Sequence, residues 1–68
     1  MSRFEQFEIW EFNQGRWQFI ASFGEFEMAN ALARRRTYRV RLLHVTYDDG
    51  SKLAEEVLAE IGETRQQP

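Results

Sequence analysis

Five arginines within eight positions are the group in this sequence with the clearest potential for binding chemistry. They are Arg34, Arg35, Arg36, Arg39 and Arg41. Guanidinium groups bind phosphates through several N–H donors, and Tyr38 among them offers a ring on which a base can stack. These six residues are therefore candidates for binding an anion or single-stranded nucleic acid. The competing interpretation is structural, because cations stabilise the end of a helix and strand arginines face solvent.

The charges elsewhere in the chain weigh against nucleic acid. Residues 34–47 contain five arginines and no acid. Residues 1–33 contain five acids and two basic residues, and residues 48–68 contain six acids and two basic residues. The net charge is -2, whereas domains that bind nucleic acid usually have a net basic surface. Nucleic acid is therefore the alternative partner and not the leading one.

Other residues with chemical potential form no recognisable site. His44 is the only histidine, and no serine or threonine lies in a nucleophile elbow that it could activate. The segment Asp48-Asp49-Gly50-Ser51 lacks the alternating ligands of a calcium loop and indicates a turn followed by a helix cap. Cysteine is absent, which excludes disulfides and thiolate metal sites. We predict no catalytic, metal or cofactor site, and no enzyme.

Aromatic residues form the second notable group, since eight of the ten lie between Phe4 and Phe26. The pattern predicts a β-hairpin with strands over about residues 4–12 and 16–23. A two-residue turn at Gln14-Gly15 places four aromatic residues on one side, pairing Phe12 with Trp17 and Trp10 with Phe19. The other side then presents Glu11, Gln18, Ile9, Ile20 and Phe7. A three-residue loop over residues 13–15 is the alternative register.

Three further elements are expected after the hairpin. Ser22 and Glu25 match a capping box for a helix over about residues 24–36. Residues 38–47 alternate as a strand, but the apolar parity changes at Leu43, so either a bulge intervenes or both faces are covered. Residues 52–61 have the apolar spacing of a second amphipathic helix, with Leu53, Val57 and Ile61 in one row.

The element order predicts an α+β fold of the type ββαβα. We expect a three-stranded sheet in the order 2-1-3, with both helices packed mainly on one face. A third strand beside the second strand is the alternative. Residues 1–62 would form a single domain, and residues 63–68 would form a frayed tail with nothing to bury.

The sheet face is the expected interaction surface. Two helices on one face leave part of the aromatic surface uncovered, and uncovered apolar patches mark interfaces. The candidate interface residues are Trp10, Phe12, Trp17, Phe19, Phe7 and Ile20. The leading hypothesis is a small non-enzymatic module that binds a second copy of itself, as a homodimer, or another protein.

Composition and length favour a soluble protein of the cytoplasm. No stretch approaches the ~20 apolar residues of a membrane span, so no membrane partner is expected. The amino-terminal residues include acids where a signal peptide needs an apolar segment. A domain of 68 residues buries only roughly 60% of its unfolded surface, so oligomerisation would add stability.

Three short motifs give the chain a family resemblance. They are Gly15-Arg16-Trp17 at the hairpin, Ala21-Ser22-Phe23 before an alanine-rich helix, and Val40-Arg41-Leu42 in the later strand. Over roughly residues 7–47 the chain resembles a loose group of small bacterial ββαβ(α) proteins of uncharacterised function. The resemblance implies a bacterial protein of similar fold. It implies no reaction, cofactor or binding residues.

Overall fold

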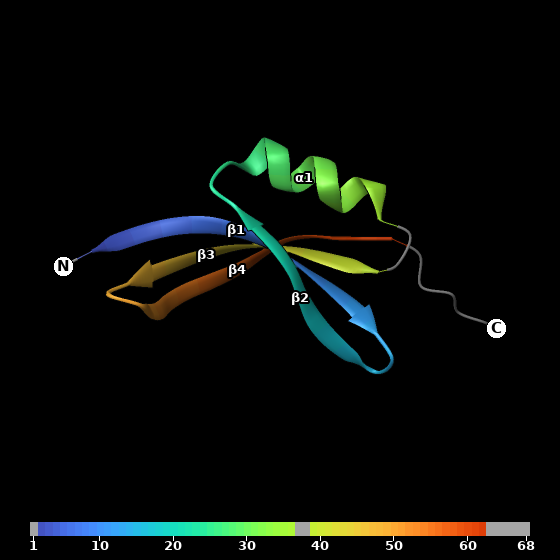
Figure 1. Ribbon diagram of the computed structural model, residues 1–68, viewed down its shortest axis with the longest axis horizontal. Helices are drawn as coiled ribbons and strands as arrows, with labels where there is room; N and C mark the ends of the chain where they lie inside the picture. Colours follow the sequence, from blue (N-terminus) through green and yellow to red (C-terminus); the bar gives the residue numbers. More distant parts are fainter. Residues whose placement is uncertain (1, 37–38, 63–68) are drawn as a thin grey trace.

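The computed structural model describes residues 2–36 and 39–62, which form one antiparallel sheet and one helix (Figure 1). The elements are β1 (Arg3–Asn13), β2 (Arg16–Phe23), α1 (Phe26–Arg35), β3 (Val40–Asp48) and β4 (Ser51–Ile61). The four strands lie in the order β2-β1-β3-β4, and α1 crosses one face of the sheet. No helix of this described part is long and apolar enough to cross a membrane.

The first hairpin has the predicted two-residue turn. Gln14 and Gly15 both have positive φ, at 56° and 82°, as the tightest hairpin turns require. The register pairs Phe12 with Trp17, Trp10 with Phe19 and Glu11 with Gln18. The two-residue alternative is therefore confirmed, and the three-residue loop is wrong.

A β-bulge that the sequence pattern did not predict interrupts this hairpin. Ile9 pairs with Ala21 while Trp10 pairs with Phe19, so Ile20 is the extra residue on β2. Bulges increase the local twist of a strand. In Figure 1 β2 runs at a steep angle to β3 and β4, as the strong twist of the sheet requires.

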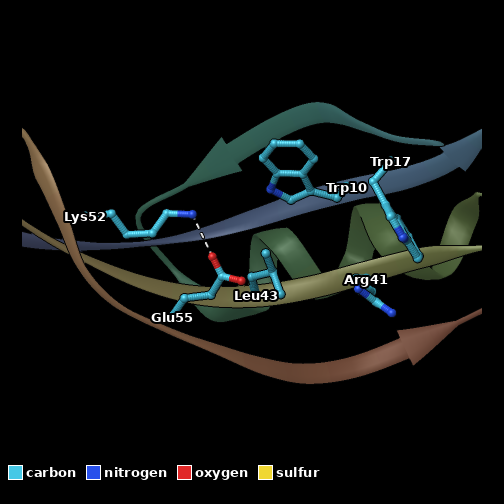
Figure 2. Close-up of a pocket in the computed structure, with 6 residues that line it drawn as sticks. All are labelled: Trp10, Trp17, Arg41, Leu43, Lys52 and Glu55. Carbon is cyan, nitrogen blue, oxygen red and sulfur yellow. Dashed lines mark hydrogen bonds and ion pairs between the residues drawn. The ribbon is translucent and has the colours of Figure 1, made fainter.

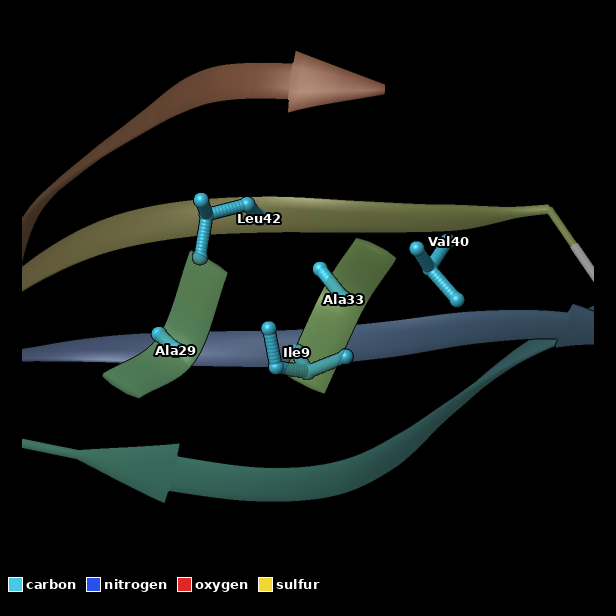
Figure 3. Close-up of a cluster of buried hydrophobic side chains, with 5 residues drawn as sticks. All are labelled: Ile9, Ala29, Ala33, Val40 and Leu42. Carbon is cyan, nitrogen blue, oxygen red and sulfur yellow. The ribbon is translucent and has the colours of Figure 1, made fainter. Parts of the chain in front are cut away.

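The hydrophobic core lies between α1 and the sheet. Its five buried residues are Ile9, Ala29, Ala33, Val40 and Leu42, each 0% exposed (Figure 3). Ala29 and Ala33 lie one turn apart on the helix, and their small side chains allow it to approach the sheet closely. Partly buried residues surround this cluster: Phe7, Ile20, Phe23, Leu32, Ala59 and Ile61. Two of the predicted interface residues, Phe7 and Ile20, therefore belong to the layer beneath the helix.

The predicted second helix is wrong, and so is the three-stranded ββαβα fold. Residues 51–61 form β4, which pairs with β3 along its length. The first three strands do lie in the order 2-1-3, but β4 extends the sheet to four strands, and within residues 2–36 and 39–62 one helix packs on it.

The turn between β3 and β4 explains this correction. Asp49 and Gly50 have φ of 55° and 86°, and Asp48 pairs with Ser51. Asp-Gly is a strong signal for a two-residue hairpin turn, and this signal outweighs the helical spacing of the residues that follow. The register shifts between Leu42 and Leu43 and between Thr46 and Tyr47. These bulges break the alternation by which β4 would have been recognised as a strand.

The limits of α1 differ from the prediction as well. The helix begins at Phe26, with Glu25 as its N-cap and no side-chain capping hydrogen bond. Ser22 lies inside β2, where it pairs with Glu8, so the predicted capping box is not formed. The predicted start of the third strand at residue 38 and the frayed tail over residues 63–68 lie outside the described residues.

The parity change in β3 has one of the two causes foreseen as alternatives, the covering of both faces. Val40 and Leu42 are buried beneath α1, whereas Leu43 and Val45 are buried on the opposite face, at 6% and 0% exposed. Val45 lies between Gln6 of β1 and Glu55 of β4. Both faces of β3 are therefore covered, and the predicted bulge in β3 is wrong, because β3 pairs with β1 without a shift and the extra residues at the bulges belong to β4.

Two leucines provide a matched test of this core. Leu42→Ala removes a fully buried side chain, and we expect the free energy of unfolding to fall by about 2–5 kcal/mol. Leu53→Ala makes the same chemical change at a side chain that is 54% exposed, so a loss below about 1 kcal/mol is expected. Urea denaturation followed by circular dichroism measures both, and equal losses would contradict this packing.

Candidate functional site: the open face of the sheet

The open face is the face of the sheet turned away from α1. Strand side chains alternate, so residues adjacent in sequence to the buried Ile9 and Leu42 point away from the helix. Strands β1 and β2 contribute Phe4, Gln6, Glu8, Trp10, Phe12, Trp17 and Phe19. Strands β3 and β4, with the residue before β3, contribute Arg39, Arg41, Leu43, Val45, Tyr47, Lys52, Glu55, Val57 and Glu60.

Four predicted interface residues lie together on this face as two cross-strand pairs. The rings of Phe12 and Trp17 are 5.2 Å apart at 63°, and those of Trp10 and Phe19 are 5.5 Å apart at 71°. Such edge-to-face pairs are favourable beyond the area that they bury. Phe19 is nevertheless 50% exposed and Phe12 36% exposed. The pairs are ordered but remain open to solvent.

Two arginines lie on the same end of the open face as these rings. The Arg41 guanidinium carbon is 4.2 Å from the centre of the Trp17 ring, and that of Arg39 is 5.6 Å from it. Glu60 of β4 accepts hydrogen bonds from Arg39 Nε at 2.8 Å and from Arg41 Nε at 3.4 Å. The hydrogen bond from Arg39 is the main cause that lowers the pKa of Glu60. Both arginines are therefore held against the aromatic rings.

The remaining predicted anion-binding residues lie elsewhere. Arg34 and Arg35 are exposed on α1, on the other side of the sheet. Arg36 Nη2 donates to Glu11 Oε2 at 3.0 Å, and this carboxylate is buried on the helix side. Tyr38 is outside the described residues. The fold brings only Arg39 and Arg41 together with aromatic side chains.

A buried carboxylate lies at the centre of the open face. Glu8 is only 3% exposed, and three neutral side chains donate hydrogen bonds to it. The donors are Tyr47 Oη at 2.7 Å, Gln6 Nε2 at 2.8 Å and Trp10 Nε1 at 2.9 Å. Burial is the largest single effect on the pKa of Glu8 and raises it, but the three hydrogen bonds together outweigh burial and hold the pKa below its ordinary value. The hydrogen bond to Glu8 in turn raises the pKa of Tyr47.

Glu8 orders the aromatic residues around it. It fixes the indole of Trp10 and the phenol of Tyr47, and the Tyr47 ring stacks on Phe4 at 5.2 Å. Sequence reasoning counted Glu8 only as a charge. A signal was present, because Glu8 shares the strand parity of Trp10 and Phe12 and so belongs to the same face.

A pocket of about 210 Å³ opens on this face (Figure 2). It is lined by Trp10, Trp17, Arg41, Leu43, Lys52 and Glu55. The two indoles form one side, while Lys52 Nζ donates to Glu55 Oε1 at 2.6 Å at the end away from Arg41. The pocket therefore combines apolar walls with charged groups at both ends.

The residues considered for catalysis or metal binding lie away from this pocket. His44 is on the helix side, where its ring stacks on Phe7 and its Nε2 lies 2.9 Å from Glu5 Oε1. Asp49 belongs to the hairpin turn, and its Oδ1 accepts a hydrogen bond from the Ser2 amide at 2.8 Å. Across residues 2–36 and 39–62 no three acidic, histidine or cysteine side chains are grouped so that they could hold a metal ion.

Comparison with models of known families, with curated proteins and with solved structures finds no match. The resemblance to small bacterial proteins therefore stays a prediction. The open face is therefore the basis of the function proposed below.

The network around Glu8 predicts a specific pH dependence of stability. Since the folded-state pKa lies below the ordinary value of 4.5, the stabilisation is present above that pH and is lost as the pH falls through the folded pKa. Glu8→Gln cannot accept all three hydrogen bonds, so we expect a loss of about 1–3 kcal/mol at pH 7 and a weaker decline of stability in acid. Urea denaturation between pH 7 and pH 3 measures both effects.

The matched control is Glu27→Gln, which makes the same charge change at an exposed position on α1. This variant should keep the stability and the acid sensitivity of the unmodified chain. Identical pH profiles for the unmodified chain and Glu8→Gln would show that the buried network adds nothing to stability.

Proposed function

We propose that this chain is a non-enzymatic interaction module that binds a protein partner, most simply a second copy of itself, through the open face of its sheet. The observation that carries the proposal is a set of ordered aromatic side chains that no helix of the described chain covers. Trp, Phe, Tyr and Arg are the residues enriched at protein interfaces. Here they are concentrated on one face.

The order of these side chains supports binding. A rigid surface loses little conformational freedom when a partner covers it, so more of the contact energy appears as affinity. Trp10 and Tyr47 are fixed by Glu8, and Trp17 is held between Phe12 and Arg41. The exposed Phe19 and Phe12 then offer apolar area that a partner can bury.

The buried position of Glu8 also supports binding at the open face. Removing a carboxylate from water is costly, and an apolar residue in the centre of a sheet would often be at least as stable. What the carboxylate adds is a fixed orientation for two large aromatic side chains. Such orientation has value on a surface that recognises a partner.

The charge of the open face suits a protein partner better than nucleic acid. Its cations are Arg39, Arg41 and Lys52, and its carboxylates are Glu8, Glu55 and Glu60. These charges balance, whereas a polyanion is attracted by a clear excess of positive charge. A small domain also gains stability when a second copy covers its uncovered face.

Two phenylalanines of similar exposure test which side of the molecule associates. Phe19 on the open face is 50% exposed, and Phe26 at the start of α1 is 43% exposed. We expect sedimentation of the full chain at tens of micromolar to show a dimer. Phe19→Ser should weaken the dimer at least about tenfold, while Phe26→Ser should leave it unchanged. A chain that stays monomeric to hundreds of micromolar would refute self-association.

Binding of single-stranded nucleic acid is the second candidate, because Arg39 and Arg41 share the open face with rings on which bases can stack. If the open face binds nucleic acid, labelled RNA or DNA should bind at low salt, and the affinity should fall steeply as the salt concentration rises. Substituting Arg39 and Arg41 together by Gln should abolish that binding. The matched pair Arg34 and Arg35, substituted in the same way on α1, should retain it. Fluorescence anisotropy without any shift at low salt would exclude this candidate.

A further inference from the structure

We propose that the pocket on the open face binds a single aromatic ring that carries a carboxylate. This inference rests on the proposed use of the open face for binding. It specifies the chemical class of ligand that the pocket binds. A free aromatic acid and the aromatic carboxy-terminal residue of a partner chain share this chemistry. Either would place the ring against the indoles of Trp10 and Trp17, with its carboxylate at Arg41.

The size of the pocket selects one ring. Its volume is about 210 Å³, below the range of roughly 300–1,000 Å³ that is typical of pockets for larger ligands. A cavity of about 150 Å³ is enough for benzene. The pocket therefore accepts a six-membered ring with a short substituent.

The walls of the pocket are aromatic and apolar, as the binding of such a ring requires. Trp10 and Trp17 stand on one side with Leu43 beside them (Figure 2). The Trp10 indole is anchored through Nε1, and the Trp17 ring has the Arg41 guanidinium 4.2 Å from its centre. Aromatic rings prefer edge-to-face or offset contacts with one another, and both indoles present π surface for them.

The polar groups of the pocket favour a negatively charged substituent at one end. Arg41 uses only its Nε–H, and that contact with Glu60 is long at 3.4 Å. Among the described residues its remaining guanidinium N–H groups have no hydrogen-bond partner, so they are free to donate to a carboxylate. Glu55 lies at the far end, where Lys52 already neutralises it at 2.6 Å.

Tryptophan fluorescence can report this binding directly, because both tryptophans of the chain line the pocket. Phenylacetate added to the full chain should give a saturable change in emission, and NMR shifts should map to the Trp10 and Trp17 indoles. Benzyl alcohol, which has the ring without the charge, should bind about tenfold more weakly. Arg41→Gln should remove this preference, and Arg35→Gln on α1 should keep it.

A second arm distinguishes the sources of the ligand. A short peptide that ends in Phe, compared with its carboxy-amidated form, should bind only with a free carboxylate if a chain terminus is the natural ligand. Binding of phenylacetate but not of the peptide would assign a small aromatic acid. No saturable change with either probe, or equal phenylacetate affinity in the unmodified chain and Arg41→Gln, would overturn the inference. Sedimentation of the same samples without ligand tests self-association independently, so the two proposals can fail separately.

Discussion

The described part of the chain depends on one constraint: its single helix of ten residues covers a four-stranded sheet. The small side chains of Ala29 and Ala33 bring α1 close to β1 and β3, and the buried core lies in that contact. One short helix cannot cover both faces. The second face has no helix over it among the described residues, so its side chains pack mainly against one another.

The side chains of the open face are held in place by contacts with one another. Aromatic pairs contribute about 0.5–1.5 kcal/mol each beyond the area that they bury, and partly exposed cation–π contacts about 0.5–1 kcal/mol. Surface ion pairs such as those of Glu60 add little alone. The hydrogen bonds to Glu8 matter more, because they satisfy a charge that would otherwise be buried without partners. Together these contacts order the face without hiding it from solvent.

The first hairpin could be predicted from the sequence because two independent signals agreed. Gly15 indicates the turn, the parity of Trp10 and Phe12 favours the two-residue register, and the structure confirms that register. The carboxy-terminal strand could not be predicted in the same way. Leu53, Val57 and Ile61 follow a helical spacing, and the bulges shift which residues share a face. Asp49-Gly50 correctly predicts a turn, but the sequence analysis places a helix after it, whereas the turn joins two strands of a hairpin.

The candidate site was predictable only in part. The four aromatic residues of the open face followed from the hairpin register, but Phe7 and Ile20 turned out to lie beneath the helix. The arginines are close in sequence, yet the chain crosses from the helix layer to the sheet within this segment, so the fold separates them. The pocket joins residues of all four strands, and no local pattern could reveal it.

The bulges of β4 have a consequence for how copies of this chain can assemble. β4 is one of the two edge strands of the sheet, with β2 at the other edge, and an unprotected edge strand is a template on which further chains can add. Here each bulge puts backbone donors and acceptors out of step with a regular neighbour, and the acidic side chains of Glu55 and Glu56 repel an identical strand. Fibre-like growth on the β4 edge is therefore disfavoured. In the proposed dimer the contact is a face, which closes after one partner, whereas pairing along an edge strand can extend from copy to copy.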